Sequence, residues 1–292
     1  MPAPSWLITP ILPAGGLVGL YGQPGVCKSF VAIDMAMSIA TGLPWQGLPT
    51  EKGFVIYISA EGGTGIGKRV LAWLAHHQVE PRDADIAWLV ESIPVNTDSE
   101  EMATLLNRIV DEIERPPDYI VVDTLARCFD GDENQQEDMG RFVAGVDMLR
   151  KEFGCTVTVV HHTNLSGLRE RGNTAFRGAT DTMIMIEKED TQVTVTCTKQ
   201  KDAEEFEPIE LELQKVDGTD SCIVQGAQSA QQRQDIAAEV LNTLSKLQPC
   251  RWDDWREATG LNRSKFQKSF QLLRRNNQAI KGKGGLWTIP AP

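Results

Sequence analysis

The sequence predicts an α/β fold, in which a mostly parallel sheet carries helices on both faces, followed by a small C-terminal winged helix-turn-helix domain. Short, nearly continuous apolar runs recur along most of the chain, and amphipathic segments separate them. After residue 234 the apolar spacing becomes helical and basic residues accumulate. We therefore expect one domain over residues 1–224, a linker over 225–234 and a second domain over 235–292.

The predicted strands of the first domain are short runs rich in β-branched and aromatic residues. Five of them alternate with helical segments, which is typical of a parallel sheet. They cover residues 16–21, 54–59, 86–90, 119–123 and 155–160. Three further runs follow without helices between them and are expected to extend the sheet as antiparallel hairpins. These later runs cover residues 183–187, 193–198 and 209–214.

A helix is predicted over residues 28–40, directly after the first strand. Phe30, Ile33 and Met37 share one face of this segment, and Gly42 stands just past its end. The helix therefore begins where the loop that follows the first strand ends.

The second domain is predicted from a change of pattern after a Gln-rich, apolar-poor stretch, residues 225–234. Helical spacing predicts helices over about 236–244, 252–260 and 261–276, and residues 279–290 indicate two short strands around a Gly-Lys turn. Three helices followed by a hairpin are the elements of a winged helix-turn-helix.

Charge is divided unevenly between the two predicted domains. The chain has a net charge of -11, but from Ser229 onward 11 Lys and Arg stand against 5 Asp and Glu, so this part is +6 and the remainder is -17. An acidic body with a basic tail favours DNA contact in the tail and in particular loops of the body. A basic surface without a partner is the alternative.

The six cysteines are scattered without a CxxC pair, which argues against a zinc site and against a secreted disulfide scaffold. We find no leader of basic then apolar residues, and no apolar run approaches the length that crosses a bilayer. A cytoplasmic protein without a membrane partner is therefore expected.

The segment GQPGVCKS, residues 22–29, has the context of a phosphate-binding loop, because it follows an apolar strand and opens a helix. Lys28 can neutralise the β- and γ-phosphates of ATP, and Ser29 can bind Mg²⁺. Cys27 replaces a glycine of the GxxxxGK[ST] motif, so a side chain stands where the backbone approaches phosphate. An ordinary strand-to-helix turn would not explain the Lys-Ser pair. The predicted ATP-binding residues are Gly22, Gln23, Pro24, Gly25, Val26, Cys27, Lys28, Ser29 and Phe30.

Two carboxylates are candidates for the chemistry of ATP hydrolysis. Asp123 ends the apolar strand YIVVD and can hold Mg²⁺ through water, as in a Walker B element. Because Thr124 and not Glu follows it, the base that orients the attacking water must come from elsewhere. Glu61, at the end of FVIYISAE, is the candidate base, and a surface glutamate that begins a turn is the alternative.

His161 and His162 directly follow the predicted strand CTVTVV. A histidine at this position can contact the γ-phosphate and report its loss, as a switch residue does. A structural pair or part of a metal site is the alternative, but no third ligand of suitable spacing accompanies them.

With Lys28, Glu61, Asp123 and His162 at successive strand ends, the chain resembles the RepA-like hexameric replicative helicases of plasmids and phages, and the wider RecA/DnaB/KaiC superfamily. The matching motifs lie between about Trp6 and Gln214 and are GLYGQPGVCKSF, YISAEGG, VVDTLAR, VVHHTN and RGNTAFRGATD. The resemblance implies a RecA-like fold, catalysis by Glu61 and Lys28, and contact of His162 with the γ-phosphate side of ATP.

The resemblance also implies a ring, commonly a hexamer of identical chains, with ATP between subunits and single-stranded DNA through the centre. The segment TKQKD, residues 198–202, resembles the finger of DnaB-type helicases, so Lys199 and Lys201 would reach the neighbour's nucleotide. Lysine in place of arginine loses bidentate geometry. Arg177 is a second candidate for this role.

DNA contacts are expected in two places. In the segment 164–176, Arg169 and Arg171 form a candidate pore loop, although a flexible surface loop is the alternative. The tail is expected to bind duplex DNA through its third helix and its wing, with docking of a protein as the alternative. The basic residues concerned are Arg263, Lys265, Lys268, Arg274, Arg275, Lys281 and Lys283.

Two functions therefore fit the sequence. The first is an ATP-dependent DNA helicase or translocase of the RepA-like type, acting in plasmid or phage DNA replication. The second is an ATP-switched DNA-binding regulator or replication initiator without unwinding activity. The candidate residues Glu61, Asp123 and His162 favour the first, whereas the altered phosphate loop favours the second.

Overall fold

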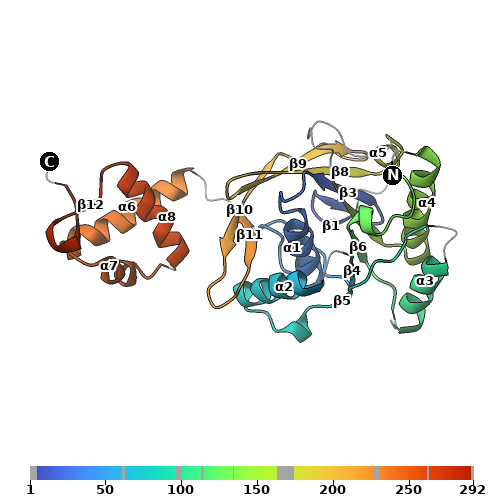
Figure 1. Cartoon of the computed structure of the whole chain (residues 1–292), viewed down its shortest axis with the longest axis horizontal. Coiled ribbons are helices and arrows are strands. Elements are labelled where there is room, and N and C mark those ends of the chain that lie inside the picture. Colours follow the sequence, from blue (N-terminus) through green and yellow to red (C-terminus); the bar gives the residue numbers. More distant parts are fainter. Residues whose placement is uncertain are drawn as a thin grey trace. The chain divides into compact units, whose positions relative to one another are not determined.

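The fold is described from a computed structural model that covers residues 5–60, 63–96, 100–112, 115–133, 135–162, 174–226, 230–261 and 263–290. Contacts divide the chain into two compact units, residues 1–226 and 227–292. The first unit holds a large sheet between helices, and the second holds three helices and a short hairpin (Figure 1). The predicted α/β class with a mostly parallel sheet and helices on both faces is confirmed.

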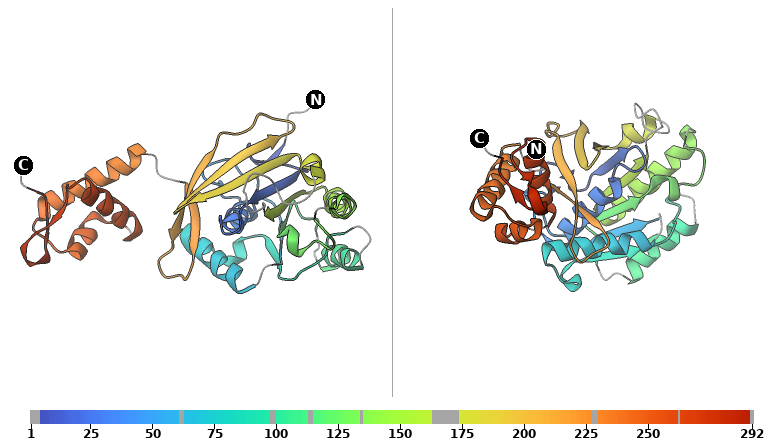
Figure 2. Two further views of the ribbon diagram at one scale, coloured as in Figure 1. Left: turned by 45° about the horizontal axis from the view of Figure 1, so that its top comes forward. Right: turned by 60° about the vertical axis from the view of Figure 1, so that its left-hand side comes forward.

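Within the described residues, the first unit is built on a nine-stranded sheet with the order β11-β10-β9-β8-β3-β7-β6-β4-β5. Neighbouring strands pair in parallel along the run β8, β3, β7, β6, β4 and β5. Strands β8, β9, β10 and β11 pair antiparallel and form the extension in yellow and orange in Figure 2. Its strands are β3 Leu17–Gly22, β4 Val55–Ser59, β5 Ile86–Leu89, β6 Tyr119–Asp123, β7 Thr156–His162, β8 Thr182–Glu189, β9 Gln192–Gln200, β10 Ile209–Lys215 and β11 Cys222–Gly226. A separate small pair precedes them, β1 Trp6–Ile8 and β2 Leu12–Pro13.

The two faces of the sheet are packed against different helices, because successive side chains of a strand point to opposite faces. Along β6, Tyr119 and Val121 belong to the core cluster that contains α1, whereas Ile120 and Val122 belong to the cluster that contains α4. The helices of this unit are α1 Lys28–Thr41, α2 Gly63–His77, α3 Glu100–Glu112, α4 Gln136–Phe153 and α5 Thr174–Ala179.

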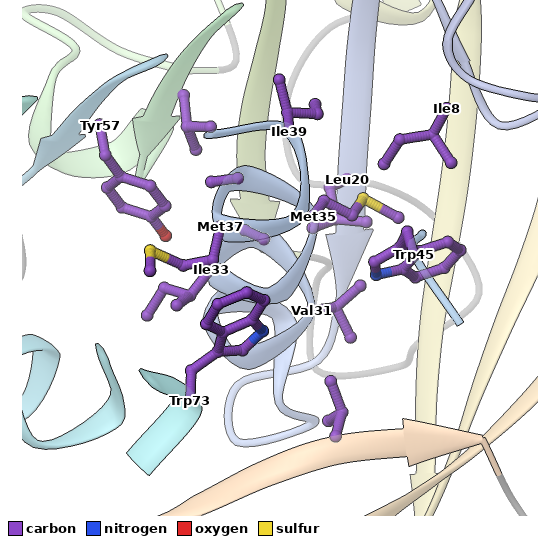
Figure 3. Close-up of a cluster of buried hydrophobic side chains, with 14 of the residues drawn as sticks. Ile8, Leu20, Val31, Ile33, Met35, Met37, Ile39, Trp45, Tyr57 and Trp73 are labelled. Carbon is purple, nitrogen blue, oxygen red and sulfur yellow. The ribbon is translucent and has the colours of Figure 1, made fainter. Parts of the chain in front are cut away.

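The helix α1 is the most buried helix of the first unit and carries the phosphate loop on its N-terminus. Residues 31–40 are all buried, and Gly42 ends the helix in the left-handed conformation with φ 76°. Figure 3 shows the side chains of α1 between Tyr57 and Trp73 on one side and Trp45 on the other. The loop before α1 is therefore attached to a rigid part of the core.

Asp34 is a carboxylate buried within this core. Its oxygens accept hydrogen bonds from the Trp73 indole N–H at 2.7 Å and from the Gln46 amide at 2.6 Å. Gln46 in turn accepts the backbone N–H of Gly226 at 2.6 Å, so Asp34 connects α1 and α2 with the end of β11. Burial raises the pKa of Asp34 from 3.8 to about 6, because desolvation disfavours the charged form.

We expect Asp34→Asn to reduce the pH dependence of stability. A raised pKa in the folded state means that Asp34 contributes stability below about pH 4 and that this contribution is lost as pH rises through 6. Between pH 4 and pH 7 the unfolding free energy of the wild type should fall by roughly 3 kcal/mol relative to the variant. Urea unfolding at several pH values measures this. Asp217→Asn, at an exposed position, is the control, and parallel pH profiles of wild type and Asp34→Asn would contradict the assignment.

The second unit comprises α6 Ala230–Leu247, α7 Trp252–Thr259, α8 Arg263–Arg275, β12 Ile280–Lys281 and β13 Trp287–Thr288. Its core is aromatic, with Trp255, Phe266 and Phe270 in edge-to-face or stacked contacts. The three predicted helices and the predicted hairpin all occur, while the assignment as a winged helix-turn-helix remains a prediction.

The boundary between the units differs from the expected linker over 225–234. Residues 225 and 226 end β11, and residues 230–234 belong to α6. Gln is a good helix former, so a Gln-rich composition indicated too long a linker. Among the described helices, none is both long and apolar enough to span a membrane.

Candidate functional site

The loop between β3 and α1 has the geometry that phosphate binding requires. β3 is central in the sheet, and residues 23–27 connect its end to the N-terminus of α1. Gly25 has φ 82°, a conformation that favours glycine. The N-terminus of α1 follows this loop, so its N–H groups and the positive end of the helix dipole would favour an anion there.

Cys27 occupies the cap position of α1 in a left-handed conformation with φ 73° and ψ 22°. Glycine adopts this conformation without strain, which is the physical reason for glycine at this place in the motif. Burial raises the pKa of the Cys27 thiol, although Lys188 and Arg69 act in the opposite direction. Cys27 therefore remains a neutral thiol at the rim of the loop.

Lys28 lies folded across its own loop. The residue is 4% exposed, and its ammonium group donates hydrogen bonds to the carbonyl oxygens of Gly22 at 2.9 Å and Gln23 at 2.8 Å. It also lies 2.9 Å from Nδ1 of His162, which ends β7. The structure therefore brings together two residues that the sequence assigned to the γ-phosphate side of ATP.

Asp123 ends β6 on the same face of the sheet as α1, and α1 packs against β6. Its carboxylate is buried and accepts a hydrogen bond from the Tyr57 hydroxyl at 2.6 Å. Burial and the Asp123 carboxylate hold the pKa of Tyr57 well above its usual value, so Tyr57 acts as a donor.

The donor set fits Mg²⁺, which prefers oxygen ligands and usually keeps several waters. The Ser29 hydroxyl lies in the first turn of α1, and the buried Asp123 carboxylate ends a strand that packs against α1. These two residues would hold the ion, Ser29 directly and Asp123 through water.

A cavity of about 140 Å³ adjoins the phosphate loop. Gly22, Gln23 and Val26 line one side, and residues 185–188 of β8 line the other. The approach is close, since a Cβ atom on Gly22 would lie 2.2 Å from the carbonyl oxygen of Ile186. Glycine at position 22 is therefore needed for β3 and β8 to pack at this point.

The two predicted histidines have different surroundings. His161 is buried, and its ring lies 6.0 Å from the ring of Phe176 in α5. His162 is partly exposed and contacts Lys28. The structure therefore places His162, and not His161, beside the phosphate loop.

Lys199, Lys201 and Arg177, the residues expected to reach a neighbour's nucleotide, lie at the opposite end of the strands from the phosphate loop. β9 is antiparallel to β8, so Lys199 pairs with Met183 beside the beginning of β8, whereas the phosphate loop follows the end of β3. Lys199 donates to the carbonyl oxygens of Arg177 and Gly178 in α5, and Arg177 donates to the carbonyl of Thr198 at 2.8 Å. Lys201 pairs with Asp181 at 3.2 Å, and its side chain is 61% exposed.

The structure does not describe several of the residues that the sequence predicted for the site. Glu61, Arg169 and Arg171 lie outside the described residues, as do the side chains of Lys265, Lys268 and Lys283. In the second unit, Arg263, Arg274, Arg275 and Lys281 are exposed.

Sequence reasoning missed two residues near the site. Tyr57 reaches Asp123 from the neighbouring strand, and Arg69 of α2 places its guanidinium 4.5 Å from the centre of the Phe30 ring. Tyr57 could have been found from its position two residues before the end of its strand. This would have required knowing that its strand adjoins the Walker B strand.

Comparison with known families agrees with this geometry. The family model described as AAA domain matches residues 1–167. The matched region includes the phosphate loop, Asp123 and His162, and it ends before the finger candidates and the second unit. The match supports an ATPase of the P-loop type.

Proposed function

Because the chain belongs to the AAA domain family of P-loop ATPases, we propose that it is an ATP-dependent DNA helicase or translocase of the RepA-like type, acting in plasmid or phage replication. The observation that carries the proposal is the contact of Lys28 with His162 at the carboxyl edge of the parallel strands, where Asp123 also ends. Ligands of open α/β sheets bind at this edge.

In this function the residues act on the phosphates of ATP. Backbone N–H groups of the loop and the Lys28 ammonium would hold the β- and γ-phosphates. Ser29 and Asp123 would hold Mg²⁺, which would supply positive charge against the negative charge of the phosphates. Glu61 would orient the attacking water, and His162 would exchange its contact with Lys28 for one with the γ-phosphate.

The second unit supports a DNA-binding role. Arg274 and Lys281 both lie over the Trp287 ring, at 5.7 and 6.0 Å from its centre, so two exposed cations converge from α8 and β12. Arg263 lies over the Trp252 ring at 5.9 Å. Cations held against rings in this way are positioned with less loss of entropy when they meet phosphates.

An ATP-switched DNA-binding regulator without unwinding activity is the second candidate. The left-handed Cys27 in the phosphate loop and the compact basic second unit favour it. A strand-displacement assay on a forked duplex separates the two. Release of the strand with ATP, but not with a non-hydrolysable analogue, supports the helicase. ATP-dependent binding without release supports the regulator.

We expect the second unit to bind duplex DNA through counterion release. If Arg274 and Lys281 each neutralise a phosphate, changing both to Ala should reduce the slope of log K against log salt by roughly 0.9 per contact. Fluorescence anisotropy with a labelled duplex at several salt concentrations measures the slope. Arg256→Ala is the matched control, because Arg256 pairs with Glu257 on α7. An unchanged slope in the double variant would favour docking of a protein.

A further inference from the structure

We propose that Tyr57 is a positioning residue for the Mg²⁺ site, and that its hydroxyl fixes the orientation of the Asp123 carboxylate. The inference rests on the proposed function, because Asp123 matters here as the residue that holds Mg²⁺. It gives a role to Tyr57, the first residue of the segment YISAEGG, to which no role was assigned above.

The contact follows from the register of two neighbouring strands. In the parallel pair of β4 and β6, Ser59 lies beside Asp123 and Tyr57 lies beside Val121. Side chains two residues apart share a face of the sheet, so Tyr57 and Asp123 point to the same side. The long phenol side chain spans one register step and places its hydroxyl 2.6 Å from the Asp123 carboxylate.

Packing fixes the position of the Tyr57 hydroxyl. Tyr57 is fully buried, and its ring lies 4.9 Å from the Trp88 ring in β5, at an angle of 34°. On the other side it faces Met37 of α1 (Figure 3). A ring held by β5 and α1 has little freedom, so the hydrogen bond fixes one carboxylate oxygen with respect to the helix that carries the phosphate loop.

A buried carboxylate that holds an ion through water must keep a single orientation. Loss of the Tyr57 hydroxyl would remove a hydrogen bond that restrains rotation of the Asp123 carboxylate about its last bond, and the added freedom would oppose Mg²⁺ binding. Partners that orient the ligands of a metal typically change its affinity about 10-fold to 100-fold when they are removed. We therefore expect Tyr57→Phe to bind Mg²⁺ about 10-fold more weakly than the wild type.

The structure offers a matched control in Tyr119. Tyr119 is also fully buried in this sheet, and its hydroxyl donates to the Thr158 hydroxyl at 2.9 Å. Tyr57→Phe and Tyr119→Phe therefore each remove one buried hydroxyl and one hydrogen bond to a side-chain oxygen, and each keeps the packed ring. Only the first removes a contact with Asp123.

The experiment uses the full chain and a fluorescent ADP analogue. Its affinity is measured in EDTA and over a series of MgCl₂ concentrations, and the ATPase rate is measured over the same series. Tyr57→Phe should need about 10-fold more Mg²⁺ to reach half of the full effect, with unchanged affinity in EDTA and near-normal kcat at saturating Mg²⁺. Tyr119→Phe should resemble the wild type in all of these.

Wild-type Mg²⁺ dependence in Tyr57→Phe, or an equal shift in both variants, would overturn the proposal. Unfolding of Tyr57→Phe alone would show a structural role and would also overturn it. Asp123→Asn distinguishes this failure from failure of the proposed function. If Asp123→Asn shifts the Mg²⁺ dependence and Tyr57→Phe does not, only the inference about Tyr57 fails, whereas a wild type without Mg²⁺-dependent nucleotide binding removes both.

Discussion

Lys28→Ala should abolish ATP hydrolysis and weaken nucleotide binding. The Lys28 side chain is buried, and its ammonium group is held by two carbonyl oxygens of the loop. Removing a preorganised charge from a site of this kind typically lowers kcat by about 10²- to 10³-fold. Steady-state phosphate release measures the rate, and titration with a fluorescent ADP analogue measures binding.

Two variants make the result specific. Lys151→Ala removes an exposed lysine that pairs with Asp147 on α4, and it should hydrolyse ATP at the wild-type rate. Glu61→Gln should keep nucleotide binding and stop hydrolysis, because it removes the base but keeps the shape of the side chain. Full turnover in folded Lys28→Ala would remove the phosphate-loop assignment.

The parts of the fold that the sequence predicted are those that local pattern determines. The run YIVVD is apolar enough to be buried on both faces, and β6 covers the predicted residues 119–123. The phosphate loop was predictable for the same reason, since its strand, its lysine and its helix are contiguous in the chain. β11 was missed because CIVQG is short and half polar, and only pairing with β10 makes it a strand.

Contacts between distant segments could not be predicted. The sequence contains Tyr57 and Asp123 in separate strands, but their contact depends on β4 lying beside β6, and the order of strands is a property of the whole sheet. Asp34 was missed for a similar reason. Its donors come from Trp73 and Gln46, which are 39 and 12 residues away, and without them a carboxylate inside a helix indicates a solvent-exposed face.

Assembly of several chains should be needed for full hydrolysis, with Lys201 as the residue that a neighbour supplies. Lys201 follows β9 beside the start of β8, and the phosphate loop lies at the other end of β3, roughly 13 Å away along the strand. Within one chain this separation exceeds the reach of the lysine, so any contact with nucleotide would involve a second copy. A cation supplied by a neighbouring subunit raises the rate of hydrolysis by ~10³-fold or more.

Lys201→Ala should leave the fold intact, because Asp181, the ion-pair partner of Lys201, keeps other partners. Asp181 also pairs with Arg150 at 3.3 Å and accepts the backbone N–H of Leu17 at 2.9 Å. The lost ion pair is largely exposed and should change stability by about 1 kcal/mol or less. Lys68→Ala, which breaks the exposed pair of Lys68 with Asp220, is the matched control and should stay active.

Complementation between two inactive variants should then restore activity. Lys201→Ala keeps an intact phosphate loop, and Lys28→Ala keeps an intact Lys201, so a site between one chain of each kind contains both cations. An equimolar mixture should recover roughly one quarter of the wild-type rate. Half of the chains retain Lys28, and half of the neighbours of these chains retain Lys201. The measurement is phosphate release by each variant alone, by the mixture, and by wild type over a range of concentrations. A mixture as inactive as its components, together with a wild-type specific activity that does not change on dilution, would show that Lys201 does not complete a neighbour's site.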